Sequence, residues 1–250
     1  MIEKLGLQLY TIRDYMKTAE DIRESFRKIR AMGYTVGQTA GCAIPYAEFG
    51  RIAAEEGIEI CGTHDNFDLM VTDPELSMEN HRCLGTTNMG IGGFHAATVA
   101  DVDAFIEKAN RVADIIYEHG FKFTYHNHSH EFMRFDDGST TMERLVEGLN
   151  PEKTSFVLDT YWVQHGGGDV RHWIEKLAGR VDILHLKDMG RGPDGPFITE
   201  IGNGHIWWEG VLETAEKAGI KHYVVEQDYW PGDPFESAAK SAAYLKKFVK

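Results

Sequence analysis

The segment YHNHSHEF, at residues 125–132, gathers three histidines and one glutamate within eight positions. Imidazole nitrogens and carboxylate oxygens are protein groups that bind divalent metal ions and transfer protons. The segment follows an apolar helical pattern and Gly120, so it lies where a buried strand is expected to end. It is not the HExxH motif of zinc peptidases, because no histidine follows four residues after His130. The chemistry of these side chains therefore depends on where the rest of the chain places its polar residues.

Other short β-rich runs also end in chemically useful side chains. One carboxylate alone after a strand is well explained as a helix cap or as the partner of a lysine. A series of such residues along consecutive strands indicates a shared site instead. The strand-end residues are His64 and Asp65, His95, Asp159, His185 with Lys187 and Asp188, and Glu226 with Asp228.

Eight rounds of a β-rich run and an amphipathic helical pattern position these residues. The runs lie at residues 5–11, 35–40, 59–64, 88–94, 122–128, 154–160, 181–188 and 222–228. The clearest helical pattern covers 101–119, where apolar residues recur every three or four positions. This alternation predicts an α/β fold, a (β/α)8 TIM barrel with a single domain over residues 1–250. A doubly wound open sheet is the alternative, but it would normally carry a glycine-rich loop after its first strand, where this chain has YTIRDYM.

Helix ends can also be located from the sequence. Gly33, Gly57 and Gly120 each precede a predicted strand, where a left-handed residue commonly ends a helix. Thr18 and Asp21 have the spacing of a capping box that opens the first helix. The last helix is expected over residues 235–249.

In a barrel, the C-terminal ends of the strands surround one bowl. The residues expected to face one another there are Glu131, Asp159, His185 and Glu226. Burying three carboxylates close together is unfavourable unless a positive charge neutralises them, and a divalent cation does so economically. Three carboxylates and one imidazole form an oxygen-rich ligand set that favours Mn²⁺, with Mg²⁺, Co²⁺ and Zn²⁺ as the other candidates.

Composition excludes several classes of protein. The formal net charge of −13 disfavours binding to a nucleic acid backbone, which requires clustered lysine and arginine. No apolar run reaches the roughly 18 residues of a membrane helix, and the N-terminal residues do not resemble a signal peptide, so we expect a cytoplasmic protein that does not bind membranes. The three cysteines form no CxxC pair and are expected to be small buried residues. A small neutral or cation-bridged substrate fits this composition.

The strand ends YHNHSHEF, LDTYWVQHGGGD, HLKD and VEQD, in this order and spacing, resemble the xylose-isomerase-like TIM-barrel family of sugar phosphate isomerases and epimerases. The resemblance covers essentially the whole chain. It implies that Glu131, Asp159, His185 and Glu226 bind the metal. It also implies that Glu131 and Glu226 are the acid and base that face opposite sides of a substrate carbon, with a metal-stabilised enediolate between the two proton transfers.

The resemblance suggests further contacts for the substrate. His64, Trp162 and Lys187 are expected to line the pocket or bind a substrate oxygen. His128 either orients Glu131, contacts a substrate hydroxyl or is a structural histidine behind the site. Glu200, in FITEIGNG, resembles the family's segment that closes over the sugar, with a surface salt bridge as the alternative for Lys187 and Glu200. Trp207 and Trp208 are expected to pack in the core or to form an interface, so the sequence is compatible with a homo-oligomer.

Two departures from the family pattern bear on the reaction. The epimerases carry a histidine three residues after the strand-6 aspartate, where this chain has Trp162. The DTYWV variant is more similar to the branch with inosose dehydratases and oxidised-glycoside epimerases. Glu131 also lies farther past its strand than a simple strand-end ligand would.

The sequence therefore predicts a metal-dependent isomerase or epimerase of an unphosphorylated sugar or keto sugar. A dehydratase of the inosose type, using the same acid and base groups, is the first alternative. An apurinic endonuclease would require more metal ligands and a basic groove. A sugar-binding barrel without activity would tolerate the loss of either glutamate.

Overall fold

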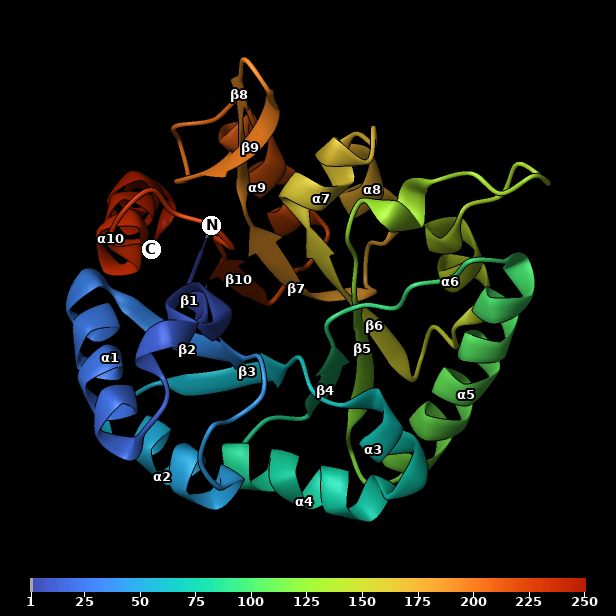
Figure 1. Ribbon diagram of the computed structural model, residues 1–250, viewed down its shortest axis with the longest axis horizontal. Helices are drawn as coiled ribbons and strands as arrows, with labels where there is room; N and C mark the ends of the chain where they lie inside the picture. The colour runs from blue at the N-terminus through green and yellow to red at the C-terminus, as the bar shows by residue number, and fades with distance from the viewer. Residues whose placement is uncertain (1) are drawn as a thin grey trace.

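The computed structural model describes residues 2–250 and has eight parallel strands at its centre, surrounded by helices (Figure 1). Their order around the sheet is β3, β2, β1, β10, β7, β6, β5, β4. The strands are β1 Leu5–Gln8, β2 Tyr34–Thr39, β3 Glu59–Thr63, β4 Asn88–Ile91, β5 Lys122–His126, β6 Thr154–Asp159, β7 Val181–Leu186 and β10 His222–Val225. The predicted (β/α)8 barrel is confirmed. The first strand is shorter than predicted, because residues 9–11 belong to the 3-10 helix η1, Leu9–Tyr15.

The seam between β3 and β4 closes the ring largely through side chains. The amide of Asp65 donates to the Gly90 carbonyl at 2.8 Å, and the Asn88 side chain donates to the Cys61 carbonyl at 2.8 Å. The amide of Gly90 donates to Thr63 Oγ1 at 3.1 Å instead of to a backbone carbonyl. Gly90 therefore packs closely against the backbone of β3 at Thr63.

We expect Gly90→Ala to destabilise the barrel. A Cβ atom at this position would lie 2.1 Å from the carbonyl oxygen of Thr63, and backbone cannot move aside cheaply. Overpacking of this kind costs about 3 kcal/mol. Urea unfolding of the purified variant measures the loss. Gly92→Ala is the matched control, because its Cβ would meet no atom closer than 3.7 Å. Equal stability of the two variants would contradict a tight seam.

Helices cover the outside of the barrel. The predicted helix at 101–119 is α5, and its apolar face packs inward as expected. Gly33, Gly57 and Gly120 have φ of +102°, +71° and +82°, and the capping box of Thr18 and Asp21 is present. The helices are α1 Ala19–Met32, α2 Tyr46–Glu55, α3 Phe67–Thr72, α4 Pro74–Leu84, α5 Val99–Tyr117, η2 His130–Phe132, α6 Thr141–Gly148, α7 Thr160–His165, α8 Val170–Lys176, α9 Trp208–Lys217, α10 Pro234–Leu245 and η3 Lys246–Phe248. Within residues 2–250, no helix has the length and apolar character needed to span a membrane.

Two buried layers hold the barrel together. The larger one lies between the strands and the helices. The smaller one fills the interior of the ring and consists of Val36, Cys61, Val157, Ile183 and Val224, one from each of five strands. Cys42 and Cys83 are only half-buried, unlike Cys61, and all three cysteines are free.

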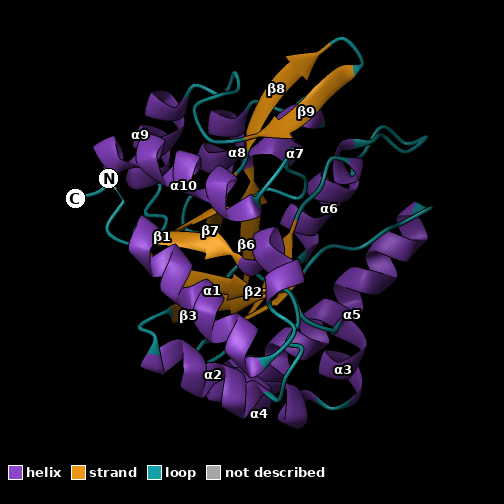
Figure 2. Ribbon diagram, turned by 60° about the vertical axis from the view of Figure 1, so that its left-hand side comes forward, coloured by secondary structure: helices purple, strands orange, loops and turns teal. Residues whose placement is uncertain are grey.

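A hairpin that the sequence analysis did not predict follows β7. It consists of β8, Asp188–Gly192, and β9, Gly195–Thr199, which pair in antiparallel fashion and project away from the barrel (Figure 2). The buried Asp188 carboxylate anchors its base by accepting hydrogen bonds from the amides of Gly202, Gly204 and Ile206 and from the Trp208 indole. Trp208 is thus a packing residue, whereas Trp207 is exposed.

Candidate active site

Strand alternation brings polar side chains into the bowl. Val157, Ile183 and Val224 belong to the interior layer of the barrel. Side chains two positions further along a strand point to the same side, one step closer to the C-terminal end. The residues at these positions are Asp159 on β6, His185 on β7 and Glu226 just after β10. Their convergence therefore follows from the pleat of three neighbouring strands.

Four buried side chains form a group that could hold a metal ion. They are His126, Asp159, His185 and Glu226, and each offers a ligand atom within 4.8 Å of the others. His185 Nδ1 lies 2.9 Å from Glu226 Oε2 and 3.6 Å from Asp159 Oδ2, and His126 Nε2 lies 3.5 Å from Asp159 Oδ2. Neither His185 Nδ1 nor Glu226 Oε2 makes a well-aligned hydrogen bond. Two nitrogen and two oxygen ligands directed at one place fit a divalent ion. We call these four residues the central group.

Hydrogen bonds from other elements orient the central group. The side-chain oxygen of Gln38 on β2 pairs with His185 Nε2, which leaves Nδ1 to face the carboxylates. The carbonyl of Gly92 lies 3.3 Å from His126 Nδ1, so Nε2 faces Asp159. Asp159 Oδ1 accepts from the amide of Trp162 at the start of α7, and its Oδ2 remains for the site. The ligand atoms of His185, His126 and Asp159 are thus selected by partners outside the group.

Lys187 supplies a positive charge among the carboxylates. Its side chain is fully buried, and Nζ lies 3.0 Å from Asp159 Oδ2, 2.7 Å from Glu226 Oε2 and 3.0 Å from Asp228 Oδ2. One ammonium group next to three carboxylates neutralises only part of their charge. The sequence analysis expected Lys187 to bind a substrate oxygen, and this contact stays a prediction.

Burial and charge affect the neighbouring acids in opposite ways. Burial opposes ionisation of Asp159 and Glu226, but the Lys187 ammonium together with His185 and His126 outweighs it and lowers the pKa of both carboxyls. Burial and the charge of Glu226 raise the pKa of Asp228. The three carboxylates raise the pKa of Lys187 despite its burial, so this side chain stays charged.

Glu131, which the sequence analysis placed with the metal ligands, lies outside the central group. Its Oε1 accepts from the Tyr125 hydroxyl at 2.8 Å, and its Oε2 accepts from the amide of His128 at 2.8 Å. Tyr125 alternates with His126 on β5 and packs edge-on against Phe105 of α5, so the phenol draws Glu131 toward the helix layer. Glu131 belongs instead to a separate group with His128 and His130. Its roles as ligand and as proton-transfer group stay predictions that this arrangement does not support.

The sequence analysis missed His126. In the structure β5 ends at His126 rather than at 128, and His126 pairs with Val157 of β6. The alternation of the strand could have identified His126, because its side chain points to the opposite side from Tyr125 and to the same side as Thr124. Counting histidines in YHNHSHEF could not show which of them faces the interior.

A cavity of about 450 Å³ opens above the central group. Predicted contacts His64, His128 and Trp162 line it, together with His126, Glu226 and Asp228. Burial and the neighbouring histidines lower the pKa of His64, and burial lowers the pKa of His128 to about 3, so both imidazoles are neutral. The remaining lining residues are Tyr10, Ala40, Gly92 and Tyr229. We call this space the catalytic cavity.

Glu200 contacts protein groups rather than the catalytic cavity. Its carboxylate accepts hydrogen bonds from Thr199, Asn203, Ser237 and Lys240. These contacts fix the base of the β8–β9 hairpin to α10. Contact between Glu200 and a substrate stays a prediction.

We expect Glu200→Gln to remove a pH-dependent contribution to stability. Burial is outweighed by hydrogen bonds and by Lys240, which lower the pKa of Glu200 from 4.5 to about 2. The ionised carboxylate therefore stabilises the fold fully above pH 4.5, and this contribution is lost as the pH falls toward 2. Urea unfolding should show a deficit of about 1–3 kcal/mol at pH 7 that shrinks at pH 3. The exposed Glu152→Gln is the control, and a deficit independent of pH would contradict the assignment.

Comparison with known proteins finds relatives of this chain. An inosose dehydratase from Geobacillus thermodenitrificans is 28% identical over 168 residues, which cover 60% of this chain and 55% of that protein. One from Lacticaseibacillus casei is 24% identical over 153 residues, covering 54% of this chain and 50% of that protein. The chain spans about half the length of these curated relatives.

A solved structure extends the likeness to the whole chain. A sugar phosphate isomerase/epimerase from Parabacteroides distasonis superimposes with a TM-score of 0.82 at 25% identity, covering 100% of this chain and 96% of that one. The family model described as xylose isomerase-like TIM barrel matches residues 22–248. The chain belongs to the xylose isomerase-like TIM-barrel family.

Proposed function

We propose that this chain is a divalent-metal-dependent enzyme that removes a proton next to the carbonyl of a keto sugar or cyclic keto polyol and then expels a hydroxyl group from the next carbon. The observation that carries the proposal is the buried central group at the floor of the catalytic cavity. Its mixed imidazole and carboxylate ligands favour Mn²⁺, Co²⁺ or Zn²⁺ over Mg²⁺.

The chain supplies a base next to the ion site. A divalent ion held by the central group supplies Lewis-acid stabilisation of the oxygen charge that develops when a carbon next to a carbonyl loses its proton. Glu226 lines the catalytic cavity, and its lowered pKa keeps it ionised and ready to accept that proton. Lys187 holds the Glu226 carboxylate in place through an ion pair with its Oε2 atom. Trp162 and the neutral histidines His64 and His128 line the wall of this cavity.

Dehydration is favoured over epimerisation by the position of the carboxylates. Epimerisation through two bases requires one of them on each face of the reacting carbon, and Glu131 is held away from the catalytic cavity by Tyr125 and His128. Glu226 and Asp228 both line the cavity and both contact Lys187, so they lie on one side of it. In a syn elimination, the base that removes the proton and the acid that protonates the leaving hydroxyl group act from the same side. The likeness to two inosose dehydratases supports the same choice.

Epimerisation remains the second candidate, because the Parabacteroides distasonis structure is named as an isomerase/epimerase. Both reactions begin with the same proton transfer. The described residues that line the catalytic cavity include no lysine or arginine, which favours an uncharged substrate over a sugar phosphate in either case.

The test is hydrogen exchange in D₂O with a panel of inososes, 3-keto sugars and ketohexoses. We expect metal-loaded protein to incorporate deuterium next to the carbonyl of one class and to release an unsaturated product. Chelation should abolish both events, and resupply of Mn²⁺ should restore them. Exchange with an epimerised product and no dehydration would select the second candidate. Exchange that is unaffected by chelation would overturn the metal-dependent mechanism.

A further inference from the structure

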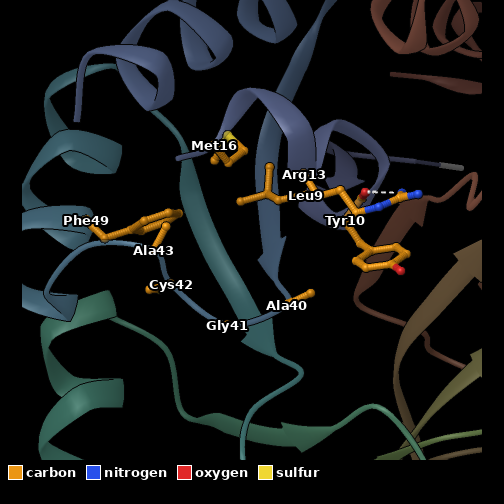
Figure 3. Close-up of a pocket in the computed structure, with 9 residues that line it drawn as sticks. All are labelled: Leu9, Tyr10, Arg13, Met16, Ala40, Gly41, Cys42, Ala43 and Phe49. Atoms are coloured by element: carbon orange, nitrogen blue, oxygen red, sulfur yellow. Dashed lines mark hydrogen bonds between the residues drawn. The ribbon is translucent and has the colours of Figure 1, made fainter. Parts of the chain in front are cut away.

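A second cavity, of about 320 Å³, lies beside the catalytic cavity. It is lined by η1, by the loop after β2 and by Phe49 of α2 (Figure 3). Tyr10 and Ala40 line both cavities, so the two spaces are neighbours. We call this second space the side cavity. A substrate larger than one sugar ring would have room there for its second part.

The side cavity is mainly apolar. Leu9, Met16 and Phe49 form a buried floor. Figure 3 shows Phe49 and Ala43 on one side of the space and Tyr10 and Ala40 on the opposite side. The described lining residues include no carboxylate. Such a surface gains free energy by taking an apolar group out of water.

Arg13 is the one cation among the described lining residues, and other groups already hold it. Its guanidinium donates hydrogen bonds to the carbonyls of Tyr10 and Asp228. It also lies between two rings, 4.1 Å from the centroid of Tyr10 and 4.8 Å from that of Trp230. These contacts hold both terminal nitrogens of the guanidinium against backbone carbonyls, so the cation lies at the edge of an otherwise apolar lining.

Local sequence explains why this space is open. The Gln8 side chain accepts a hydrogen bond from the amide of Tyr10, which ends β1 and starts η1 early. The loop after β2 begins with Ala40, Gly41 and Cys42, and Gly41 has φ of +74°, which favours glycine. The small residues at this turn leave little side-chain volume where the two cavities meet.

We propose that the side cavity is a subsite for an uncharged, largely apolar substituent of the substrate, of about the size of one aromatic ring. The substrate would then be a ring-bearing glycoside of a keto sugar rather than a free monosaccharide. This inference rests on the proposed function, because it places the sugar ring in the catalytic cavity. Its test measures binding, so that it can fail independently of turnover.

The experiment compares two ligands by titration calorimetry, the phenyl and methyl β-D-glucopyranosides oxidised to a ketone at C3. We expect metal-loaded wild-type protein to bind the phenyl glycoside about 10- to 100-fold more tightly. Ala43→Trp fills the side cavity and should abolish this preference while leaving the affinity for the methyl glycoside unchanged. The control is Ala54→Trp, an exposed position on the same loop-and-helix unit that does not line the cavity.

Equal affinities of wild-type protein for the two glycosides would overturn the subsite. An Ala43→Trp variant that lost affinity for both glycosides to the same extent would also overturn it. Melting temperatures detect misfolding, and the smaller change Ala43→Leu should give an intermediate preference. Phenol tests the same space without a sugar: its NMR signals should show saturation transfer from wild-type protein and Ala54→Trp but not from Ala43→Trp. Absence of deuterium exchange with preserved phenyl preference would overturn the proposed function and leave the subsite standing.

Discussion

Glu226→Gln is expected to lower the rate of deuterium incorporation from D₂O by about 10³-fold. The change keeps the shape of the side chain but removes the base that lines the catalytic cavity and one anionic ligand of the central group. Exchange followed by NMR on the active substrate class measures the loss, and metal analysis of the purified variant measures ion retention.

Glu213→Gln is the matched control for this prediction. Glu213 is exposed on α9 and pairs with Lys217, so its replacement should change neither exchange nor metal content. If Glu226→Gln kept more than a tenth of the wild-type exchange rate, Glu226 would not be the base. Sugar binding that survived without any exchange in the wild-type protein would instead indicate a barrel without activity.

Lys187→Met is expected to destabilise the metal-free protein by about 3–5 kcal/mol, because it leaves buried carboxylates without their positive partner. Methionine keeps much of the length and apolar stem of lysine, so a cavity contributes little. For a chain of this size the loss corresponds to a fall in Tm of roughly 6–20 °C in the presence of a chelator. A divalent ion should restore much of the difference, since it supplies the missing charge to the same carboxylates.

Thermal unfolding with chelator and with Mn²⁺ checks this prediction. Lys217→Met, on the exposed face of α9, is the control and should leave Tm nearly unchanged in both conditions. An unchanged Tm for metal-free Lys187→Met would show that the carboxylates tolerate their crowding without the ammonium. A large loss that Mn²⁺ does not reverse would show that the ion and Lys187 neutralise different groups.

The fold could be predicted because it follows from two regular patterns of apolar residues, one typical of strands and one typical of helices. Alternating β-rich and helical patterns fixed the eight parallel strands, and the glycines and the capping box fixed several helix ends. The same alternation within strands brought Asp159, His185 and Glu226 together, since all three end strands in the same phase.

Other features depend on side-chain contacts that no repeating pattern in the sequence predicts. Glu131 follows β5 in a short 3-10 turn, and its direction is decided by the hydroxyl of Tyr125 rather than by strand geometry. The buried ammonium of Lys187 could not be distinguished from a surface lysine, because its partners are distant in sequence: Asp159 ends β6 and Asp228 follows β10. The β8–β9 hairpin is short and rich in glycine, and its anchor Asp188 resembles any acidic residue at the end of a strand.

The hydrogen bond between Gln38 and His185 joins the two halves of the chain at the central group. All four members of the central group lie in the second half of the chain, between residues 126 and 226. Gln38 and Gly92, which orient the two imidazoles, lie in the first half. A fragment with only the second half of the chain would keep all four ligands but would lose the groups that fix the tautomers of the two imidazoles. Metal binding by the central group therefore requires both halves of the chain.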